Sequence, residues 1–312
     1  MSATMKGYDL VADVHGYADQ LTKLLERLGY RKRSGCYRHR SRKVIFLGDF
    51  IDRGPQITET LRVVRPMVDE GEALAVMGNH EYNAIRYAAK GPRGYLREHN
   101  AKNFNQHRAT LRAFAHKKNK WRDYLRWFRR LPLYLDLPGL RVVHACWCDK
   151  AIRALAGRNV LTDEMLLAES ETAAERRRAA ELLLRGKEIP LPPGYVFIDK
   201  DGSSRSTVRA RWWLSANSRT YRDLAIPNPD TLPDLRIKRE IEARLTGYPA
   251  AAPPVVIWHY WLTSAKPRPL APNVACLDYS VAAGGPLVAY RWHGERKFDR
   301  SRFCVCRARK EV

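Results

Sequence analysis

The sequence predicts an α/β fold in which two β-sheets are flanked by helices. In the first third of the 312 residues, short apolar runs alternate with helical periodicity, which is typical of β-α-β units and a largely parallel sheet. Further apolar runs near the C-terminus indicate a second sheet. Apolar residues make up 45% of the chain and charged residues 29%, a balance that supports a packed core and argues against intrinsic disorder.

The first third of the chain repeats the β-α-β pattern. Residues 8–12 are the first predicted strand, and leucines at helical spacing follow them. Residues 43–47 are predicted as a second strand, apolar on both faces like a strand that helices cover on each side. A helix over residues 57–68, kinked or interrupted at Pro66, and a strand over residues 73–77 complete this part.

The remaining elements are less regular. Residues 84–130 are basic, aromatic and predicted to be helical, and a strand follows at 140–143. Residues 162–186 are again helical and charged, whereas residues 189–254 are rich in Pro, Gly and short loops. We interpret residues at about 150–250 as an insert within a single domain spanning residues 1–312. Four late strands are expected to close the second sheet, at residues 255–257, 274–277, 287–291 and 303–305.

The composition predicts a cytoplasmic protein that does not span a membrane. The longest apolar runs fall far short of the roughly 20 residues that cross a bilayer. The first ten residues contain no apolar segment of the kind found in secretory signals.

The charge is strongly basic, with 56 Lys+Arg against 33 Asp+Glu and a formal net charge of +23. A basic surface attracts phosphate-rich partners, and nucleic acid is one of them. Arginine on solvated faces in an Arg-rich proteome would give the same composition, so the charge alone does not identify a partner.

Polar segments follow each of the first three predicted strands. They are DVHG at 13–16, GDFIDRGP at 48–55 and GNHE at 78–81. Open α/β sheets bind their ligands at the carboxyl ends of the strands, where these segments lie. Asp13 and His15 are two residues apart, so on an extended chain both side chains can point toward one ion. Glycines flank the polar residues and permit close backbone approach.

Two single histidines extend this pattern. His144 ends the apolar run at 141–144, and His259 ends the run at 255–259. Each therefore follows a predicted strand, like the three polar segments. The other histidines have no such context and are expected at the surface or in packing: His39, His99, His107, His116 and His293.

These motifs, in this order, resemble the calcineurin-like metallophosphoesterases, and within them the phosphoprotein phosphatase branch, which is related to bacterial protein phosphatases and diadenosine tetraphosphate hydrolases. The resemblance covers residues 8–262 and the closing strands, and it leaves the insert unexplained. It implies a two-sheet β-sandwich flanked by helices.

The resemblance also implies a site with two divalent metal ions. Asp13 and His15 would hold one ion, Asp49 would bridge both, and Asn79, His144 and His259 would hold the second. Carboxylate, amide and imidazole ligands suit Mn²⁺, the first expectation, as well as Fe or Zn²⁺. The implied reaction is attack of a metal-bridging hydroxide on phosphorus. Arg53 would bind phosphate oxygens, His80 would protonate the leaving oxygen, and Asp52 would orient His80.

Three positions depart from the family pattern. Ala12 precedes Asp13 and Trp258 precedes His259, where glycine is common in the family. Ala145, Cys146 and Trp147 follow His144 in place of the family's glycines. The indole of Trp258 is expected either to narrow the pocket or to turn outward.

The insert and the cysteines leave two further questions open. Arg209 and Arg211 precede Trp212 and Trp213. The arginines could bind phosphate beside a nucleotide-stacking surface, or the tryptophans could pack the insert while the arginines face water. Cysteines separated by one residue occur at 146 and 148 and at 304 and 306. A four-sulfur zinc site is conceivable, but this spacing favours reduced core thiols.

The leading functional prediction is a phosphomonoesterase of the serine/threonine protein phosphatase type, because the third motif ends in Glu81 as it does in the protein phosphatases. A symmetrical dinucleoside polyphosphate hydrolase is the first alternative, since it shares the implied metal ligands. The substrate would thus be a phosphoprotein or a nucleotide. An RNA-end phosphatase or phosphodiesterase also fits the basic charge. A catalytically inactive nucleic-acid-binding protein is the alternative from another class.

Overall fold

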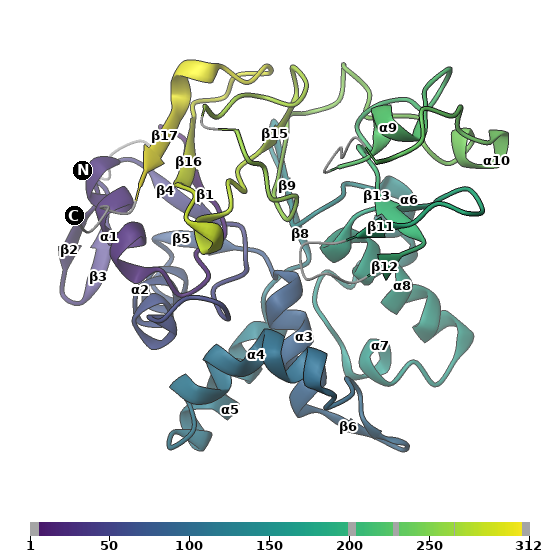
Figure 1. The fold of residues 1–312 in the computed structure, drawn as a ribbon. Helices are drawn as coiled ribbons and strands as arrows, with labels where there is room; N and C mark the ends of the chain where they lie inside the picture. Colours follow the sequence, from purple (N-terminus) through teal and green to yellow (C-terminus); the bar gives the residue numbers. More distant parts are fainter. Residues whose placement is uncertain (1–5, 199–203, 227–230, 265, 308–312) are drawn as a thin grey trace.

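The computed structural model describes residues 6–198, 204–226, 231–264 and 266–307 (Figure 1). Its larger sheet has the strand order β17-β16-β1-β4-β5. The central strands β1 (Tyr8–Val11), β4 (Lys43–Phe46) and β5 (Ala73–Ala75) are parallel. β16 (Leu287–Trp292) pairs antiparallel with β1, and β17 (Phe303–Cys306) pairs antiparallel with β16.

The helices after β1 and β4 confirm the β-α-β pattern of the first third. α1 (Ala18–Arg27) and α2 (Ile57–Asp69) each bury an apolar stripe against the core. Pro66 lies inside α2 and does not interrupt it, since the helix continues for three residues beyond it. A short hairpin of β2 (Arg31–Arg33) and β3 (Cys36–Arg38) joins α1 to β4 and was not predicted.

The second sheet has the order β15-β14-β9-β8. β8 (Tyr134–Leu137) and β9 (Leu140–Val143) form a hairpin, and β14 (Val255–Ile257) lies parallel to β9 and to β15 (Val274–Cys276). The prediction that all four late strands close this sheet was wrong for the last two. β16 and β17 return to the first sheet, where the backbone of β16 satisfies the free edge of β1.

Three helices link the two sheets in the chain (Figure 1). α3 (Asn79–Ala88) begins directly after the loop that follows β5, and α4 (Ala101–Ala113) and α5 (Lys118–Arg129) come next. Between α3 and α4 lies a small hairpin of β6 (Lys90–Gly91) and β7 (Gly94–Tyr95). The aromatic face of α5 is buried through Tyr124, Trp127 and Phe128, and residues of both sheets belong to the same apolar core.

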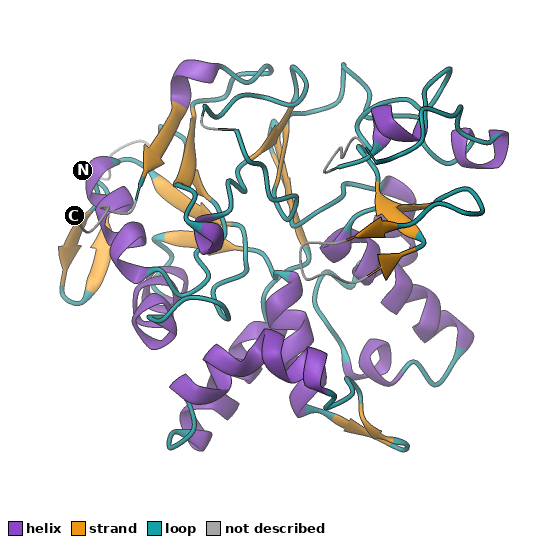
Figure 2. Ribbon diagram, in the orientation of Figure 1, coloured by secondary structure: helices purple, strands orange, loops and turns teal. Residues whose placement is uncertain are grey.

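The chain between β9 and β14 consists of short elements (Figure 2). Its longest helix is α8 (Glu171–Arg185). The others are α6 (Asp149–Ala154), α7 (Asp163–Leu167), α9 (Tyr221–Leu224), α10 (Arg239–Glu242), β10 (Glu188–Pro190) paired with β13 (Thr207–Arg209), and β11 (Phe197–Ile198) paired with β12 (Ser204–Arg205). The prediction that this region is an insert in a single domain stays a prediction.

The two tryptophans of this region pack it onto the core. Trp212 donates its indole N–H to the carbonyl of Ala145 at 2.9 Å, and Trp213 packs edge-on against Tyr260. Both indoles are buried. The structure therefore favours the alternative in which the two tryptophans pack the insert onto the core and do not form a nucleotide-stacking surface. Among the described helices, none has the length and apolar character needed to cross a membrane.

Candidate metal centre

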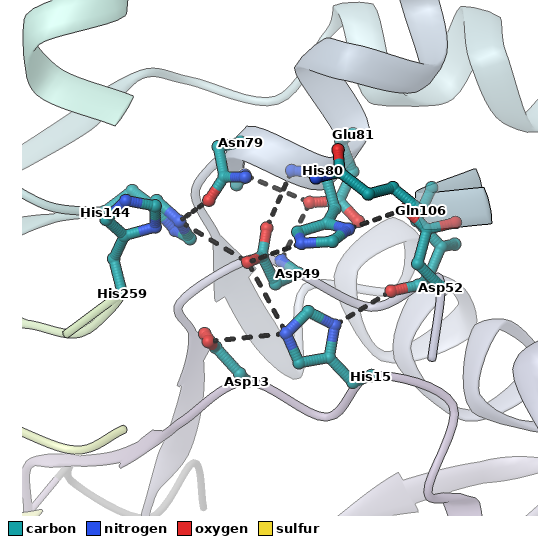
Figure 3. A network of polar contacts seen from close by, with 12 residues as sticks. Asp13, His15, Asp49, Asp52, Asn79, His80, Glu81, Gln106, His144 and His259 are labelled. Atoms are coloured by element: carbon teal, nitrogen blue, oxygen red, sulfur yellow. Dashed lines mark hydrogen bonds and ion pairs between the residues drawn. The ribbon is translucent and has the colours of Figure 1, made fainter. Parts of the chain in front are cut away.

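The predicted metal ligands meet at the carboxyl ends of strands from both sheets. Asp13 and His15 follow β1, Asp49 follows β4, and Asn79 is the first residue of α3. His144 follows β9 and His259 follows β14, so the second sheet supplies both of its ligands from neighbouring parallel strands. Figure 3 shows the six side chains turned toward one another, with Asp49 in the middle.

Asp49 is the geometric centre of this group. Its Oδ2 lies 3.7 Å from His15 Nε2 and 3.6 Å from His144 Nε2. Its Oδ1 accepts a hydrogen bond from the backbone N–H of His80 at 2.9 Å. Asp49, His144 and His259 bring their ligand atoms within 4.8 Å of one another, which suits coordination of a common cation.

A second set of ligand atoms lies beside the first. His15, Asp49 and His80 form another group within 4.8 Å. Asp13 Oδ2 lies 3.7 Å from His15 Nε2, and Asn79 Oδ1 lies 2.8 Å from His144 Nε2. The carboxylate of Asp49 belongs to both groups, which is the position that a bridging ligand requires.

The chemistry of these side chains fits divalent cations. Both carboxylate oxygens of Asp13 and the Nε2 atom of His259 are buried and have no hydrogen-bond partner within the described chain. A buried polar atom without a partner is costly unless something else satisfies it. Oxygen and imidazole nitrogen are the donors that Mn²⁺, Fe and Zn²⁺ accept.

Burial favours the neutral form of each of these ligand side chains, and a bound cation would offset that cost for the carboxylate of Asp13. Burial, reinforced by the charges of Asp278 and Asp49, raises the pKa of Asp13 well above its usual value. Burial lowers the pKa of His144 and of His259 well below the ordinary histidine value. The imidazoles are therefore neutral at pH 7, with a lone pair available for a metal.

The backbone at the ligands is strained. His15, Asp49 and His259 have φ values of 44°, 49° and 77°, in the left-handed region that L-residues seldom adopt. Such conformations cost about 1–3 kcal/mol each and concentrate at functional sites. The local geometry is thus set by the site rather than by backbone preference.

Glu81 holds two of the motif loops together. Its carboxylate accepts backbone hydrogen bonds from Asp49 at 2.8 Å, Phe50 at 2.9 Å and Gly78 at 3.1 Å. Burial raises its pKa to about 7 even though these bonds favour the ionised form. In the sequence, Glu81 is informative only as the residue that ends the third motif. Its structural role is to fix the loop of Asp49 against the start of α3.

Asp52 lies between two histidines. Its Oδ2 contacts His80 Nδ1 at 2.6 Å and its Oδ1 contacts His107 Nδ1 at 2.7 Å. The hydroxyl of Thr110 donates to Oδ1 at 2.5 Å and accepts the backbone N–H of Asp52 at 2.9 Å. Burial alone would raise the pKa of Asp52, but the hydrogen bonds from His107 and His80 outweigh it and hold that pKa well below its usual value.

The expectation that His107 is a surface or packing residue holds for packing, because its ring lies against those of Tyr87 and Trp121, but it missed the contact with Asp52. The side chain is 2% exposed and reaches Asp52 from α4, 55 residues further along the chain. No local motif marks His107. Its helix contains apolar and basic residues without a recognised pattern, and only the tertiary fold brings it to the site.

Arg53 and Trp261 form a pair at the edge of the site. The guanidinium of Arg53 lies 4.4 Å from the ring centroid of Trp261, a cation–π distance. The backbone N–H of Trp261 donates to Asp278 Oδ2 at 2.9 Å. Neither Trp261 nor Asp278 was singled out from the sequence as a site residue. Asp278 lies two residues after the end of β15, however, as Asp13 and His259 do after β1 and β14.

A cavity of about 840 Å³ opens onto the metal centre. Asp49, Asn79 and His259 line it together with His80 and Arg53. Residues between β9 and β14 line its other side: Glu188, Phe197, Arg205, Thr207, Val208, Arg209 and Ile226. The cavity thus joins the metal centre to the region that the family resemblance does not explain.

The structure separates the two arginines that the sequence grouped. Arg209 lines the cavity and donates from Nη1 to the carbonyl of His259 at 3.2 Å. Arg211 is not among the cavity-lining residues, and its backbone N–H bonds to Leu224. β13 ends at Arg209, and the turn after it directs Arg211 elsewhere.

The structure answers the questions raised by Trp258 and by the paired cysteines. Trp258 neither narrows the cavity nor turns outward, because its indole is fully buried and packs edge-on against the ring of His144 at 4.5 Å. The six cysteines are free thiols. No cysteine belongs to a metal-ligating group in the described ranges.

Comparison with known proteins agrees with this geometry. The calcineurin-like phosphoesterase family matches residues 9–163 of the chain. The asymmetrical bis(5'-nucleosyl)-tetraphosphatase PrpE of Oceanobacillus iheyensis is 31% identical over 140 residues, which cover 44% of this chain and 54% of that relative. The PrpE protein of Halalkalibacterium halodurans is 41% identical over 81 residues, which cover 26% of this chain and 33% of that relative.

The similarity to these curated relatives is thus confined to about half of their length or less. A solved structure of a protein serine/threonine phosphatase from Saccharomyces cerevisiae covers 100% of this chain and 85% of its own, with 12% identity and a TM-score of 0.51. That likeness concerns the fold alone. The residues of the matched motifs also converge on Asp49 in the structure. The chain therefore belongs to the calcineurin-like phosphoesterase family.

Proposed function

We propose that this protein is a metal-dependent phosphoesterase. The observation that carries the proposal is the convergence of six side chains with metal-ligand chemistry around Asp49, at the edge of a cavity that Asp49, Asn79 and His259 line together with His80 and Arg53. Asp13, His15, Asp49, Asn79, His144 and His259 would hold two divalent ions, with manganese as the first candidate. When bound, such ions supply Lewis acidity toward phosphate oxygens and activate water.

The protein's own residues position the phosphate and move the proton. Arg53 presents a planar guanidinium that can donate two hydrogen bonds to phosphate oxygens, and the Trp261 ring restricts its position. Arg209 places a second guanidinium on the cavity wall beside His259. Asp52 accepts the Nδ1 proton of His80, which leaves Nε2 of His80 to deliver a proton to the leaving oxygen.

The role of His80 is testable with leaving groups of different basicity. General acid catalysis contributes about 10²–10⁴-fold and matters most when the leaving oxygen is basic. In His80→Asn, turnover of an alkyl phosphate should fall about 100-fold or more, and turnover of nitrophenyl phosphate should fall much less. Equal losses on the two esters would show that His80 is not the acid.

The candidate substrate class is a nucleotide with a phosphate chain. The relatives named above are asymmetrical bis(5'-nucleosyl)-tetraphosphatases. The cavity of about 840 Å³ is also large for a single phosphoryl group, and Phe197, Tyr260 and Trp261 give it aromatic walls. A phosphomonoesterase acting on phosphoproteins is the second candidate, supported by Glu81 at the end of the third motif.

Product analysis separates these candidates. Manganese-loaded protein would be assayed on a phosphopeptide, on diadenosine tetraphosphate and on bis-nitrophenyl phosphate. Asymmetrical cleavage of the tetraphosphate gives ATP and AMP, whereas the symmetrical cleavage considered from sequence gives two ADP. Turnover of the phosphopeptide alone would favour the second candidate. Salt-sensitive RNA binding without turnover of any ester would favour a binding protein.

A further inference from the structure

Besides the proposed ligand Asn79, the cavity wall formed by α3 and α4 carries two amide side chains, Asn83 and Gln106. An arginine supports each of them. Arg185, the last residue of α8, donates from Nη2 to Asn83 Oδ1 at 3.1 Å. Arg97, between β7 and α4, donates from Nη2 to Gln106 Oε1 at 2.7 Å. Two independent segments thus place a guanidinium behind the same wall.

These contacts determine whether the carbonyl or the NH₂ group of each amide is available to a ligand in the cavity. An amide side chain has one carbonyl acceptor and one NH₂ donor group. Since the carbonyls of Asn83 and Gln106 accept from arginines, their NH₂ groups are the polar atoms left for a ligand. Neither NH₂ group donates a hydrogen bond to another residue of the described chain. The wall therefore offers hydrogen-bond donors.

The two arginines also lack a counter-charge. Within the described residues, neither guanidinium has a carboxylate oxygen within 4.0 Å. Asp52, whose charge acts on Arg97, is already engaged by His80 and His107, and Glu181 is engaged by Arg86 at 3.4 Å and by the hydroxyl of Tyr82 at 2.7 Å. Burial and the nearby charge of Arg185 lower the pKa of Arg97. Such a pair of partly buried cations is stabilised by an anion.

The position of this wall relative to His80 indicates which anion it would bind. Asn83 lies three residues after His80 on α3, so the two side chains share one face of the helix. Gln106 directly precedes His107 on α4, which contacts Asp52. The donors therefore lie on the side of the cavity where His80 meets the leaving group.

We propose that Arg97, Arg185, Asn83 and Gln106 form a subsite for the leaving phosphate chain of a substrate with phosphate anhydride bonds. The inference rests on the proposed phosphoesterase function and narrows its substrate class. A phosphomonoester of a protein has no second phosphate to place there. A nucleoside polyphosphate, a dinucleoside polyphosphate and inorganic polyphosphate share the required chemistry, because each presents several charged phosphate oxygens in a row to the amide donors and to the positive charge of the arginines behind them.

The kinetic test compares substrates with and without a phosphate chain. The variants are Arg97→Gln, Arg185→Gln and the double variant. For the double variant, the ratio of kcat/KM on diadenosine tetraphosphate to kcat/KM on nitrophenyl phosphate should fall about 10-fold to 100-fold, mainly through KM. Each lost arginine removes a positive charge behind the wall and the hydrogen bond that orients one amide, and such a loss costs about tenfold in affinity. Arg97→Lys and Arg185→Lys keep the charge and should recover part of the ratio.

A matched control comes from the same helix. Arg178 on α8 is exposed and pairs with Glu171 at 2.6 Å, so Arg178→Gln removes one positive charge outside the cavity. In Arg178→Gln, the ratio of kcat/KM on diadenosine tetraphosphate to kcat/KM on nitrophenyl phosphate should equal that of the wild type. An unchanged ratio in the double variant, or an equal fall in Arg178→Gln, would overturn the subsite. ATP and inorganic tripolyphosphate as further substrates show whether a nucleoside is needed.

A binding measurement separates the subsite from the activity. Titration of inorganic tripolyphosphate into the full chain, in a chelating buffer so that the anion cannot act through metal, should give an affinity about tenfold weaker for the double variant. The affinity for orthophosphate should change much less. If no ester is hydrolysed but tripolyphosphate binding still depends on the arginines, the proposed function fails and the subsite stands. If the protein hydrolyses esters but the wild type and the double variant bind tripolyphosphate with equal affinity, the proposed function stands and only the subsite is overturned.

Discussion

At the scale of single residues, the contacts of Asp52 explain how a histidine outside every motif can affect the reaction. His107 and Thr110 both bond to Oδ1, while His80 bonds to Oδ2. With Oδ1 held by α4, the carboxylate keeps one orientation and presents Oδ2 to His80. In the proposed mechanism His107 is therefore a positioning residue, because it holds the carboxylate of Asp52 that contacts His80.

Replacing His107 tests this positioning role. In His107→Ala, Asp52 loses one partner and can rotate, so kcat on an alkyl phosphate should fall about tenfold, and kcat on nitrophenyl phosphate should fall less. His107→Asn retains an N–H donor and should recover part of the loss. His116→Ala, on an exposed residue beyond α4, is the control. A loss that is the same for both esters and is not recovered by asparagine would indicate a merely structural role.

Glu81 allows a second prediction at this scale. Glutamine can accept on its carbonyl but places an N–H₂ group against backbone donors, so Glu81→Gln should lower the free energy of unfolding by about 2–3 kcal/mol. Thermal unfolding and metal content check this, and Glu175→Gln on the exposed face of α8 is the control. An unchanged melting temperature together with full metal content would contradict the role.

The same variant has a predicted pH dependence in metal-free protein. Burial raises the pKa of Glu81 from 4.5 to about 7 in the folded state. The folded protein thus binds more protons than the unfolded chain between these values, and the contribution of Glu81 is fully present below pH 4.5 and lost as the pH rises through 7. The stability difference between wild type and Glu81→Gln should therefore shrink over this range in denaturant titrations. A difference that grows with pH would refute it.

At the scale of elements, the site depends on how closely the loops after β4 and β5 approach each other. A Cβ atom on Gly78 would lie 2.2 Å from Asp49 Oδ1 and 2.7 Å from Glu81 Oε2. The φ of Gly78 is −94°, which alanine adopts readily. This glycine is thus needed for space rather than for backbone conformation.

Gly78→Ala should therefore damage the metal centre more than the fold. Displacing Asp49 should reduce bound metal well below that of the wild type, measured by elemental analysis, while the overpacking costs about 1–3 kcal/mol in unfolding free energy. Gly35→Ala is the control, because its Cβ would meet nothing within 4 Å and only its φ of +84° opposes the change. Full metal content in Gly78→Ala would show that the loops can separate without loss of the site.

The elements also show what the sequence could and could not predict. Strand positions were predictable because each buried strand is a short apolar run, and the motifs mark where the strands end. The sheet membership of β16 and β17 was not, because pairing with β1 is a contact across more than 270 residues that no local pattern encodes. For the same reason, the separation of Arg211 from Arg209 and the contact of His107 with Asp52 could not be predicted from the sequence.

At the scale of the whole molecule, the proposed metal ligands come from both sheets. Asp13, His15 and Asp49 follow strands of the first sheet, and His144 and His259 follow strands of the second. Bound cations would therefore link segments of the two sheets that lie far apart in the chain. They would also relieve the repulsion among the buried carboxylates of Asp13, Asp49 and Asp278, each of which raises the cost of ionising its neighbours.

Metal removal should consequently destabilise the entire fold. A ligand at 100 to 1,000 times its dissociation constant stabilises a protein by about 3–4 kcal/mol, so chelation should lower the melting temperature by several degrees, and added Mn²⁺ should restore it. Asp49→Asn weakens both ion sites at once and should abolish the response to Mn²⁺, whereas Asp136→Asn, on exposed β8, should respond like the wild type. Hydrogen exchange locates the effect: chelation should speed exchange at the ends of both β4 and β14. Faster exchange confined to one sheet would show that the ions do not hold the two sheets together.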